Sequence, residues 1–326
     1  MRRARIISTG SYLPEKVLTN HDLERLVETS DEWITERSGI RQRYIAGTRQ
    51  ACSDLAFEAS KKALKNAGLK GKDLDLILVA TLTPDSLLPS TGCLLQDRLG
   101  AKGVPAFDLN AACSGFVYAL SVANAYIKAG LYKRVLVVGA EVLSKVTDWE
   151  DRTTCVLFGD GAGAVVVEAT AEDRGILSID LYADGSMGDL LVIPGGGSRM
   201  PASRETVAKR MHFIKMKGNE TFKFAVRTLE RLVIETLEKN GLKPSELSLL
   251  IPHQANLRII KATVERLGLS MGKVLVNIAR TGNTSAASIP IALDEALSTG
   301  RLRAGDNVLL EAFGGGITWA SALIRW

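Results

Sequence analysis

The chain has 326 residues, 46% hydrophobic and 24% charged, which is typical of a globular protein with two domains or one fused pair of domains. Its net charge of +5 is mild and its basic residues are scattered, which argues against nucleic-acid binding and suits docking of an acidic protein or a phosphorylated cofactor. No apolar run is long enough to cross a bilayer, and the N-terminal apolar stretch is too short for a signal peptide, so we expect a cytoplasmic protein with no membrane partner.

The four cysteines limit the chemistry that the chain can carry. Cys52, Cys93, Cys113 and Cys155 are widely and irregularly spaced, with no CxxC pair and no Cys/His cluster. This spacing argues against a disulfide framework and against a metal site. We expect Cys52, Cys93 and Cys155 to be structural, because none of them stands at the start of a helix.

Predicted strands and helices alternate along the first half of the chain. A strand opens the chain, and residues 63–81 then read as a helix end, a glycine cap and an apolar strand. Residues 108–130 read as a polar turn followed by an apolar helix, and strands follow at 134–141 and 159–169. This alternation predicts mostly parallel sheets that are covered by helices.

The second half begins with a strand at 175–186 and repeats this plan. Residues 236–254 match 63–81 at an offset of 173, and residues 277–300 match 108–130 at an offset of 170. We interpret the matches as a duplication with pseudo-two-fold symmetry, of residues 1–172 and 173–326, although αβ units also resemble one another without common origin.

The duplication places three polar residues where they can converge. At the offset of 170, Cys113 and Asn283 occupy equivalent turns, which would meet at the symmetry axis. His253 follows a strand of the second half, at the sheet end where open α/β sheets bind ligands. We therefore expect the three side chains to share one pocket.

Cys113 stands before a helix that is apolar on all sides, and such a helix is buried. Free backbone N–H groups and the helix dipole at this position favour the reactive thiolate. The alternative is a buried structural cysteine in a tight turn, since free cysteines are often buried.

His253 and Asn283 also have structural alternatives. A histidine at a strand end is commonly a structural hydrogen-bonding group, and an asparagine before a helix is commonly a turn or cap residue. His21 and His212 lie in polar or basic segments, so we expect both to be solvated.

The glycine run at 314–316 lies between two predicted strands, so we expect a hairpin-like turn with exposed backbone N–H groups that could bind an oxyanion. The chain has neither the GxxxxGK[ST] motif nor the Rossmann fingerprint, so nucleotide hydrolysis and hydride transfer lack their motifs.

Three motifs, "DLNAACSGFVYAL", "PHQANLRII" and "GNTSAAS", resemble the Cys-His-Asn set of β-ketoacyl-acyl-carrier-protein synthase III, a family of thiolase-fold condensing enzymes. Further similarity at 8–20, 29–43, 158–164 and 309–319 extends the resemblance over essentially the whole chain. The resemblance implies a thiolase fold, in which duplicated α/β halves form five αβαβα layers.

The resemblance also implies a reaction. Cys113 would take the acyl group of a short acyl-CoA, most simply acetyl-CoA, and malonyl-acyl-carrier protein would then lose CO2 and attack the acyl-cysteine. His253 and Asn283 would donate hydrogen bonds to the developing enolate, and His253 would also assist thiolate formation. The backbone N–H groups of Cys113 and Gly315 would form a second oxyanion hole. Acyl-CoA is a substrate here, and no cofactor or metal is expected.

Further site residues are implied by the same resemblance. Trp33 and Arg37 would share a helix face at the CoA entrance, with Arg152 across the adenine; the alternative is an N-capped surface helix with a core tryptophan. Thr153 follows Arg152 where the family often has glycine. The expected substrate and CoA contacts are Thr29, Trp33, Arg37, Arg152, Leu157, Gly218, Phe222 and Asn256.

The remaining expectations concern partners. Lys223, Arg258, Lys261 and Arg266 would dock the acidic carrier protein, although Glu265 interrupts this basic face and an ordinary solvated helix is the alternative. Leu87 and Leu88 would limit acyl length, from the partner subunit of a homodimer. Residues 194–212 read as a long basic loop that would cover the channel mouth. A relative with another acyl donor and a non-catalytic binding module remain open as functions.

Overall fold

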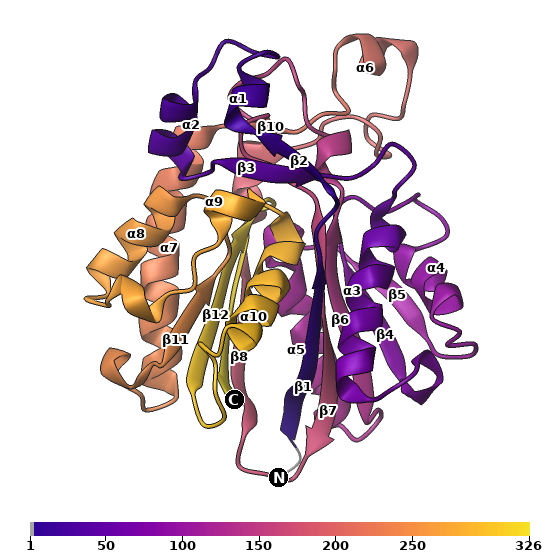
Figure 1. Ribbon diagram of the computed structural model, residues 1–326, viewed down its shortest axis with the longest axis vertical. Helices are drawn as coiled ribbons and strands as arrows, with labels where there is room; N and C mark the ends of the chain where they lie inside the picture. Colours follow the sequence, from indigo (N-terminus) through magenta and orange to yellow (C-terminus); the bar gives the residue numbers. More distant parts are fainter. Residues whose placement is uncertain (1–2) are drawn as a thin grey trace.

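Two large β-sheets organise the computed structural model, which describes residues 3–326 (Figure 1). The strands of the first sheet lie in the order β1 (Arg3–Tyr12), β7 (Gly161–Thr170), β6 (Arg134–Glu141), β4 (Leu76–Ala80) and β5 (Ala106–Leu109). β4 is parallel to β5 and β6, whereas β7 is antiparallel to both of its neighbours. β5 is therefore an edge strand within the single chain.

The second sheet is built from the second half of the chain. Its order is β11 (Leu249–Pro252), β12 (Asn307–Gly314), β13 (Thr318–Arg325) and β8 (Gly175–Ala183). β11 and β12 are parallel, and the remaining pairs are antiparallel. Three of the seven strand pairs in the two large sheets are parallel, so the prediction of mostly parallel sheets is wrong. The antiparallel pairs come from β1, β7, β8 and β13, which no helical crossover precedes. The expected hairpin-like glycine turn is present between β12 and β13.

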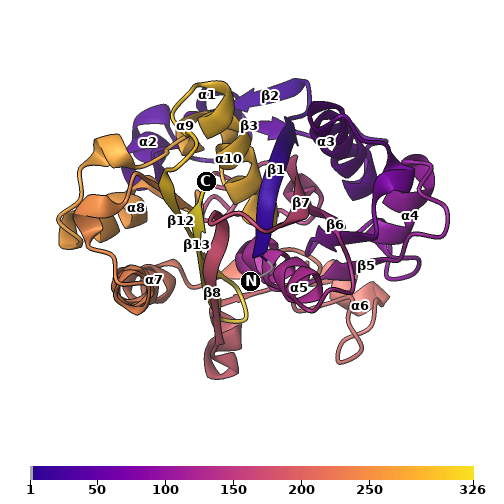
Figure 2. The same ribbon diagram turned by 90° about the horizontal axis from the view of Figure 1, so that it is seen from below.

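Helices form the other three layers, which are seen edge-on in Figure 2. α5 (Gly115–Lys128) and α10 (Ser288–Ser298) lie between the two sheets, where one apolar core contacts residues of both halves. α3 (Cys52–Ala67) and α4 (Thr91–Arg98) cover the outside of the first sheet, and α7 (Gly218–Lys239) and α8 (Leu257–Arg266) cover the second. The expected αβαβα layering is confirmed.

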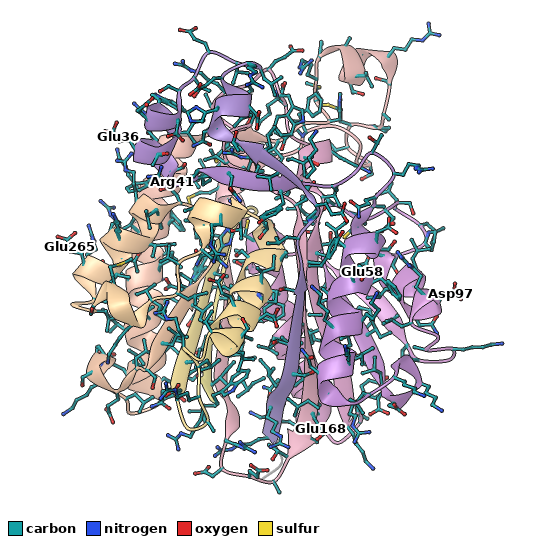
Figure 3. All side chains as sticks on the ribbon, in the orientation of Figure 1. Glu36, Arg41, Glu58, Asp97, Glu168 and Glu265 are labelled. Atoms are coloured by element: carbon teal, nitrogen blue, oxygen red, sulfur yellow. The ribbon has the colours of Figure 1, made fainter. Side chains whose placement is uncertain are left out.

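The hydrophobic pattern of each helix agrees with its layer. α5 and α10 carry apolar residues on most sides, so they can be buried between two sheets. The outer helices have one apolar face, and charged side chains such as Glu58 on α3, Asp97 on α4 and Glu265 on α8 point away from the molecule (Figure 3). No helix among residues 3–326 has both the length and the apolar character that a membrane span requires.

The two halves are related by one offset of 173 residues. β4 and β11 begin at Leu76 and Leu249, and α5 and α10 begin at Gly115 and Ser288. The prediction that Cys113 and Asn283 are equivalent is therefore wrong by three residues. α5 has 14 residues and α10 has 11, so matching the glycines after the two helices shifted the alignment of the turns before them.

The corrected offset makes Asn283 equivalent to Asn110. Each asparagine side chain accepts a hydrogen bond from the backbone N–H two residues later, at Ser285 and at Ala112. Those two residues both adopt φ 47°, a left-handed conformation that few non-glycine residues take. The division of the chain at 172/173 into separate domains stays a prediction, because α5 and α10 share one core.

A cap of small elements covers one end of the layers, and both chain ends lie at the opposite end (Figure 1). The cap comprises β2 (Lys16–Thr19), α1 (Asn20–Leu23), α2 (Asp31–Ser38), β3 (Gln42–Ile45), β9 (Leu191–Val192), α6 (Arg204–Ala208), β10 (Lys215–Met216) and α9 (Ile278–Thr281). The cap meets α8 where Asn256 Nδ2 donates to the carbonyl of Arg37 at 3.0 Å. The candidate site lies beneath this cap.

Candidate active site

A cavity of about 450 Å³ opens between the cap and the two sheets. Cys113, His253 and Asn283 all line it. The three motifs, which are far apart in the sequence, therefore contribute to one pocket, as the sequence predicts. Their catalytic roles stay predictions.

Cys113 lies in a 3₁₀ turn (Ala112–Ser114) that leads directly into α5. The turn is fixed from both sides, because Ala112 N donates to Asn110 Oδ1 and Ser114 Oγ donates to the carbonyl of Thr318. Gly314 approaches so closely that an added Cβ would lie 2.7 Å from the backbone nitrogen of Cys113. The glycine run is thus required for the close packing of the turn.

The thiol of Cys113 is protonated at neutral pH. Burial raises its pKa to about 12, and the nearby carboxylate of Glu141 adds to the increase. The hydroxyl of Ser285 and the backbone N–H groups of Cys113 and Gly315 act in the opposite direction without compensating. The expected effect of the backbone N–H groups is therefore present, because they lower the pKa, but desolvation outweighs it.

The backbone N–H groups of Cys113 and Gly315 both lie close to the sulfur, since both lower its pKa. Two N–H groups at this place would also face the carbonyl oxygen of an acyl group on the sulfur. The predicted second oxyanion hole is consistent with this geometry.

His253 follows the last residue of β11, and its backbone N–H donates to the carbonyl of Glu311 at 2.7 Å. Burial lowers the pKa of its imidazole to about 3, so the ring is neutral. Ser288 Oγ lies 2.7 Å from His253 Nδ1 and accepts the backbone N–H of Gln254. Its own proton is therefore available for Nδ1, which leaves the ring proton on Nε2.

This arrangement changes one expected role of His253. A ring with a pKa near 3, protonated at Nε2, is a hydrogen-bond donor and a poor base. The expectation that His253 assists thiolate formation is not supported by this environment. Its expected role as a neutral donor fits well.

Asn283 is held by its backbone and by one end of its side chain. Its N–H donates to the carbonyl of Leu157, and its carbonyl accepts the N–H of Gly159. Because Oδ1 accepts the N–H of Ser285 at 2.9 Å, the Nδ2 group of Asn283 is the end left to donate into the cavity.

Most of the predicted substrate contacts line the same cavity. The predicted residues found there are Trp33, Arg37, Leu157, Gly218, Phe222 and Asn256. Thr29 and Arg152 do not line it. Thr29 precedes the helix cap, which is Ser30, and its hydroxyl is buried without a hydrogen bond among residues 3–326.

Trp33 is flanked by two guanidinium groups. The Arg37 guanidinium carbon lies 5.0 Å from the ring centroid, and that of Arg152 lies 5.4 Å from it. Arg152 also donates to the carbonyl of Glu28. The sequence left two interpretations of this helix, a CoA entrance and an N-capped surface helix with a core tryptophan. The second agrees with the Ser30 cap and with the packing of Trp33 on an apolar cluster. The first agrees with the position of Trp33 in the cavity lining.

The predicted docking residues lie on the surface beside the cavity. Lys223, Arg258, Lys261 and Arg266 are all exposed. Arg258 lies over the ring of Phe222 and lines the cavity, whereas Arg266 forms an ion pair with Glu230 at 2.8 Å. Arg258 therefore fits the docking prediction better than Arg266 does.

Leu87 and Leu88 lie outside the cavity of their own chain and are 91% and 86% exposed. Cys93 is also exposed, in contrast to the buried Cys52 and Cys155, so the expectation of a structural role for Cys93 is not supported. The expectation that none of these cysteines stands at a helix start is wrong, because Cys52 is the first residue of α3 and Cys93 lies in the first turn of α4. His212 is half-buried against Phe213 rather than fully solvated.

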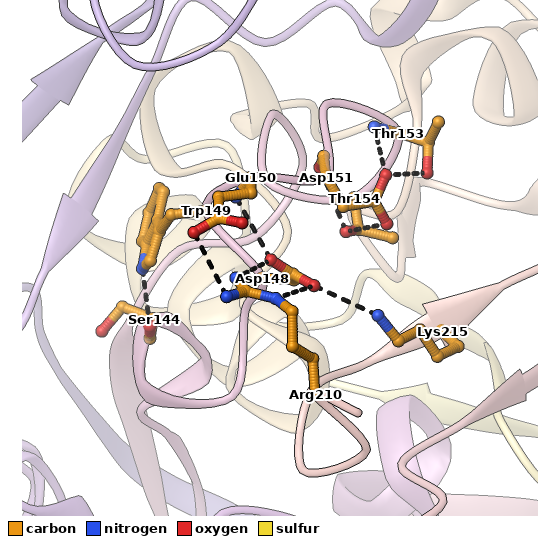
Figure 4. A network of polar contacts seen from close by, with 9 residues as sticks. All are labelled: Ser144, Asp148, Trp149, Glu150, Asp151, Thr153, Thr154, Arg210 and Lys215. Atoms are coloured by element: carbon orange, nitrogen blue, oxygen red, sulfur yellow. Dashed lines mark hydrogen bonds and ion pairs between the residues drawn. The ribbon is translucent and has the colours of Figure 1, made fainter. Parts of the chain in front are cut away.

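None of residues 194–212 lines the cavity, so the expectation that they cover its mouth is not met here. The segment is held instead against the loop that carries Arg152. Asp148 accepts hydrogen bonds from Arg210 and from Lys215 (Figure 4). The Arg210 guanidinium, followed by the Lys215 ammonium, holds the pKa of Asp148 well below its usual range.

Three polar residues near the site have no role in the sequence-based prediction. Ser285 and Ser288 stand in the "GNTSAAS" motif, and Glu141 ends a strand that was read only as a strand. At the corrected offset of 173, the position equivalent to Ser285 in the first half is Ala112, so the hydroxyl is present in only one of the two turns. Among residues 3–326, no group of three or more His, Cys, Asp and Glu side chains could hold a metal ion.

Known proteins resemble the chain over nearly its whole length. Residues 107–185 match the family described as 3-Oxoacyl-[acyl-carrier-protein (ACP)] synthase III, and residues 237–326 match its C-terminal part. The chain is 57% identical to the beta-ketoacyl-[acyl-carrier-protein] synthase III of Caldanaerobacter subterraneus subsp. tengcongensis, over 99% of this chain and 98% of that one.

Two solved structures are informative. The 3-oxoacyl-[acyl-carrier-protein] synthase III from Aquifex aeolicus VF5 is 53% identical, with a TM-score of 0.93 over 99% of this chain and 100% of that one. The priming beta-ketosynthase from the R1128 polyketide biosynthetic pathway is 35% identical, with a TM-score of 0.92 over 99% and 96%.

Proposed function

The chain belongs to the 3-oxoacyl-[acyl-carrier-protein] synthase III family of thiolase-fold acyltransferases, and on this premise we propose how its residues carry out the reaction. A short acyl-CoA, most simply acetyl-CoA, transfers its acyl group to Cys113. Malonyl-acyl-carrier protein then condenses with this acyl group to give a 3-ketoacyl-acyl-carrier protein. This product is the first ketoacyl intermediate of fatty-acid synthesis.

In the first half-reaction, the sulfur of Cys113 attacks the thioester carbonyl of acyl-CoA. The C–S bond to CoA breaks, and CoA leaves with the electron pair of that bond. The N–H groups of Cys113 and Gly315 stabilise the oxyanion that forms on the carbonyl oxygen. Covalent capture divides one difficult condensation into two easier steps.

In the second half-reaction, the malonyl group loses CO2 and leaves an enolate on the thioester. His253 Nε2–H and Asn283 Nδ2–H donate to the enolate oxygen. The enolate carbon attacks the acyl-cysteine, and the C–S bond to Cys113 breaks. The observation that carries this proposal is that a thiol and two neutral side-chain donors line one buried cavity.

The CoA nucleotide would enter beside α2. Trp33 offers a ring face, and Arg152 already lies over that ring at 5.4 Å. If the Arg152 side chain moves away from the Trp33 ring, an adenine can stack on that ring and lie between Trp33 and Arg152. Phe222, Gly218 and Asn256 line the passage from this entrance toward Cys113.

We propose that two copies of the chain associate through β5. This strand leaves one edge of its sheet unpaired, and Phe107 is exposed along it. Leu87 and Leu88 are exposed large hydrophobic residues in the loop before α4, which packs on β5. Association here would bury all three and could carry Leu87 to the acyl pocket of the other copy.

The acidic carrier protein would dock beside the cavity mouth. Arg258 lines the cavity, and Lys223 and Lys261 are exposed nearby on α7 and α8. Glu265 and the Arg266–Glu230 pair bound this face, so the docking surface is small. The cysteines are free thiols, which suits a reducing cytoplasm. The proposed reaction uses two substrates and no cofactor.

The two half-reactions can be measured separately. Acyl loading is followed by the mass of the intact protein mixed with acetyl-CoA, and decarboxylation by CO2 release from malonyl-acyl-carrier protein. His253→Ala and Asn283→Ala are expected to slow decarboxylation by about 100-fold or more, because each removes an enolate donor, and to slow loading much less. Equal loss of both half-reactions would contradict the roles given to His253 and Asn283.

A second candidate is a relative that uses a different acyl donor. The similarity to a priming β-ketosynthase of a polyketide pathway keeps this candidate open. A panel of acyl-CoAs of different length and branching, with loading read by intact mass, distinguishes the two. Loading by no acyl-CoA at all would favour a non-catalytic binding protein.

A further inference from the structure

Glu141 is a fully buried carboxylate whose charge is felt by the Cys113 thiol. It ends β6 and accepts hydrogen bonds from Leu82 N at 3.2 Å, Thr81 Oγ1 at 3.3 Å and Thr83 Oγ1 at 2.5 Å. Burial raises its pKa to about 7. Neither half-reaction proposed for the enzyme uses the Glu141 carboxylate.

The short turn that begins with Ser285 (Ser285–Ala287) packs against both β6, which ends at Glu141, and the turn Ala112–Ser114, which carries Cys113. The Ser285 hydroxyl is close enough to lower the pKa of both Glu141 and Cys113, yet it makes no hydrogen bond of ordinary geometry among residues 3–326. Hydrogen bonds that serve catalysis commonly shorten only when substrate is bound. Ser285 also adopts φ 47°, and such costly conformations persist most often at functional sites.

Accepting the proposed acyl transfer, we propose that Ser285 relays the proton of the Cys113 thiol to the buried carboxylate of Glu141. As the sulfur attacks acyl-CoA, its proton passes to Ser285 Oγ, and the Ser285 proton passes to Glu141. The carboxylate becomes a neutral carboxylic acid, and CoA leaves as a thiolate that takes a proton from solvent. When condensation expels the Cys113 thiolate, Glu141 returns the proton through Ser285.

The surroundings suit a group that stores one proton. The titratable groups around Glu141 include the thiols of Cys113 and Cys52, with Asp85 and Asp108 beyond Cys52. Its hydrogen bonds come from hydroxyl and backbone groups. The negative charge of Glu141 raises the pKa of Cys113. Moving the proton to Glu141 therefore removes the repulsion that the new thiolate would otherwise meet.

A simple electrostatic role and a relay predict opposite effects of Glu141→Gln. If Glu141 only repels the thiolate, its neutralisation lowers the pKa of Cys113 and speeds acetylation. If Glu141 receives the proton, Glu141→Gln slows acetylation by about 10- to 100-fold. The relay also predicts that the parent rate rises through the pKa of Glu141, near 7, and that Glu141→Gln loses this inflection.

Ser285→Ala provides a second variant that leaves the turn intact. Ala112 adopts the same φ of 47° in the equivalent turn, so alanine fits this conformation. The relay predicts slow acetylation for Ser285→Ala and no further loss in the double variant with Glu141→Gln, because both break one path. Glu141→Asp keeps a carboxylate and should recover part of the rate together with the inflection.

The experiment is single-turnover acetylation by acetyl-CoA from about pH 5 to about pH 9, read by intact mass. Glu311→Gln is the matched control, since it also neutralises a fully buried glutamate, and its rate and inflection should equal those of the parent chain. A Glu141→Gln chain that is acetylated as fast as the parent, with the inflection retained, would overturn the relay. A parent chain that takes no acetyl group would reject the proposed function instead.

Discussion

At the scale of single residues, the chemistry of the site depends on which groups stay neutral. Burial keeps His253 unprotonated and Cys113 protonated, and both effects follow from removing water around ionisable groups. Ser288 then decides which nitrogen of His253 carries the proton. A neutral Nε2–H donor can stabilise an enolate at any pH at which the protein is folded.

Ser288→Ala tests this orientation. The variant removes the partner of His253 Nδ1, so the ring loses its fixed tautomer and one hydrogen bond. We expect malonyl decarboxylation to slow by about 5- to 10-fold, with little effect on acetyl loading. Measurement of CO2 release by the parent and the variant checks this, and an unchanged rate would show that Ser288 does not orient the ring.

The sequence identified the three principal residues of the site because each stands in a motif with a recognisable local context. It could not identify Glu141 or Ser285 as neighbours of Cys113. Their proximity depends on β6 and the turn before α10, which are far apart in the sequence and meet only in the folded chain. The high pKa of Cys113 was also missed, because helix-start arguments consider the local dipole and omit burial.

At the scale of elements, the turns before α5 and α10 share one backbone design with different side chains. The repeat was detectable in the sequence, but its register was not, because α10 is three residues shorter than α5. Helix length is set by packing between the two sheets. Aligning the glycines after these helices therefore gave the wrong partner for Cys113.

The edge strand β5 carries the proposed dimer interface. Phe107→Asp would place a charge on the unpaired edge, beside Asp108, and should block pairing of two copies. We expect sedimentation equilibrium to show a dimer for the parent chain and a monomer for the variant. A dimeric Phe107→Asp chain would move the interface elsewhere.

The segment between β9 and β10 is fastened by Asp148. Removing its charge with Asp148→Asn weakens the contacts that Asp148 makes with Arg210 and Lys215. We expect faster hydrogen exchange in residues 204–215. A pattern identical to that of the parent would show that other contacts hold the segment.

At the scale of the whole molecule, the two halves share one apolar core that lies between the two sheets. The central helices bury apolar residues against both sheets, so the loss of one half would expose the core of the other. The alternation of strands and helices predicted sheets covered by helices, and the family resemblance supplied the five layers. The sequence could not predict the cap, whose short elements have little periodicity.

Two buried glutamates make stability depend on pH. Burial raises the pKa of Glu141 to about 7 and that of Glu311 to about 8, whereas both are near 4.3 in an unfolded chain. The folded state thus keeps protons on these two side chains that the unfolded state has lost, and their contribution to stability falls as pH rises from about 4.5 to about 8.

Glu311→Gln should remove part of this dependence. We expect the variant to be more stable than the parent by about 2 kcal/mol near pH 9 and by much less near pH 5, because glutamine has no charge to bury. Urea unfolding at both pH values measures the difference. An equal change in the free energy of unfolding at both would show that Glu311 does not retain its proton on folding.

The proposed reaction depends most on Cys113, which is the residue expected to carry the acyl group. The direct measurement is the mass of the intact protein after mixing with acetyl-CoA, for the parent chain and for Cys113→Ala, with the modified peptide then identified. We predict one acetyl group on the parent, located on Cys113, and none on the variant. Acetylation that persists in Cys113→Ala at the parent rate would contradict the account.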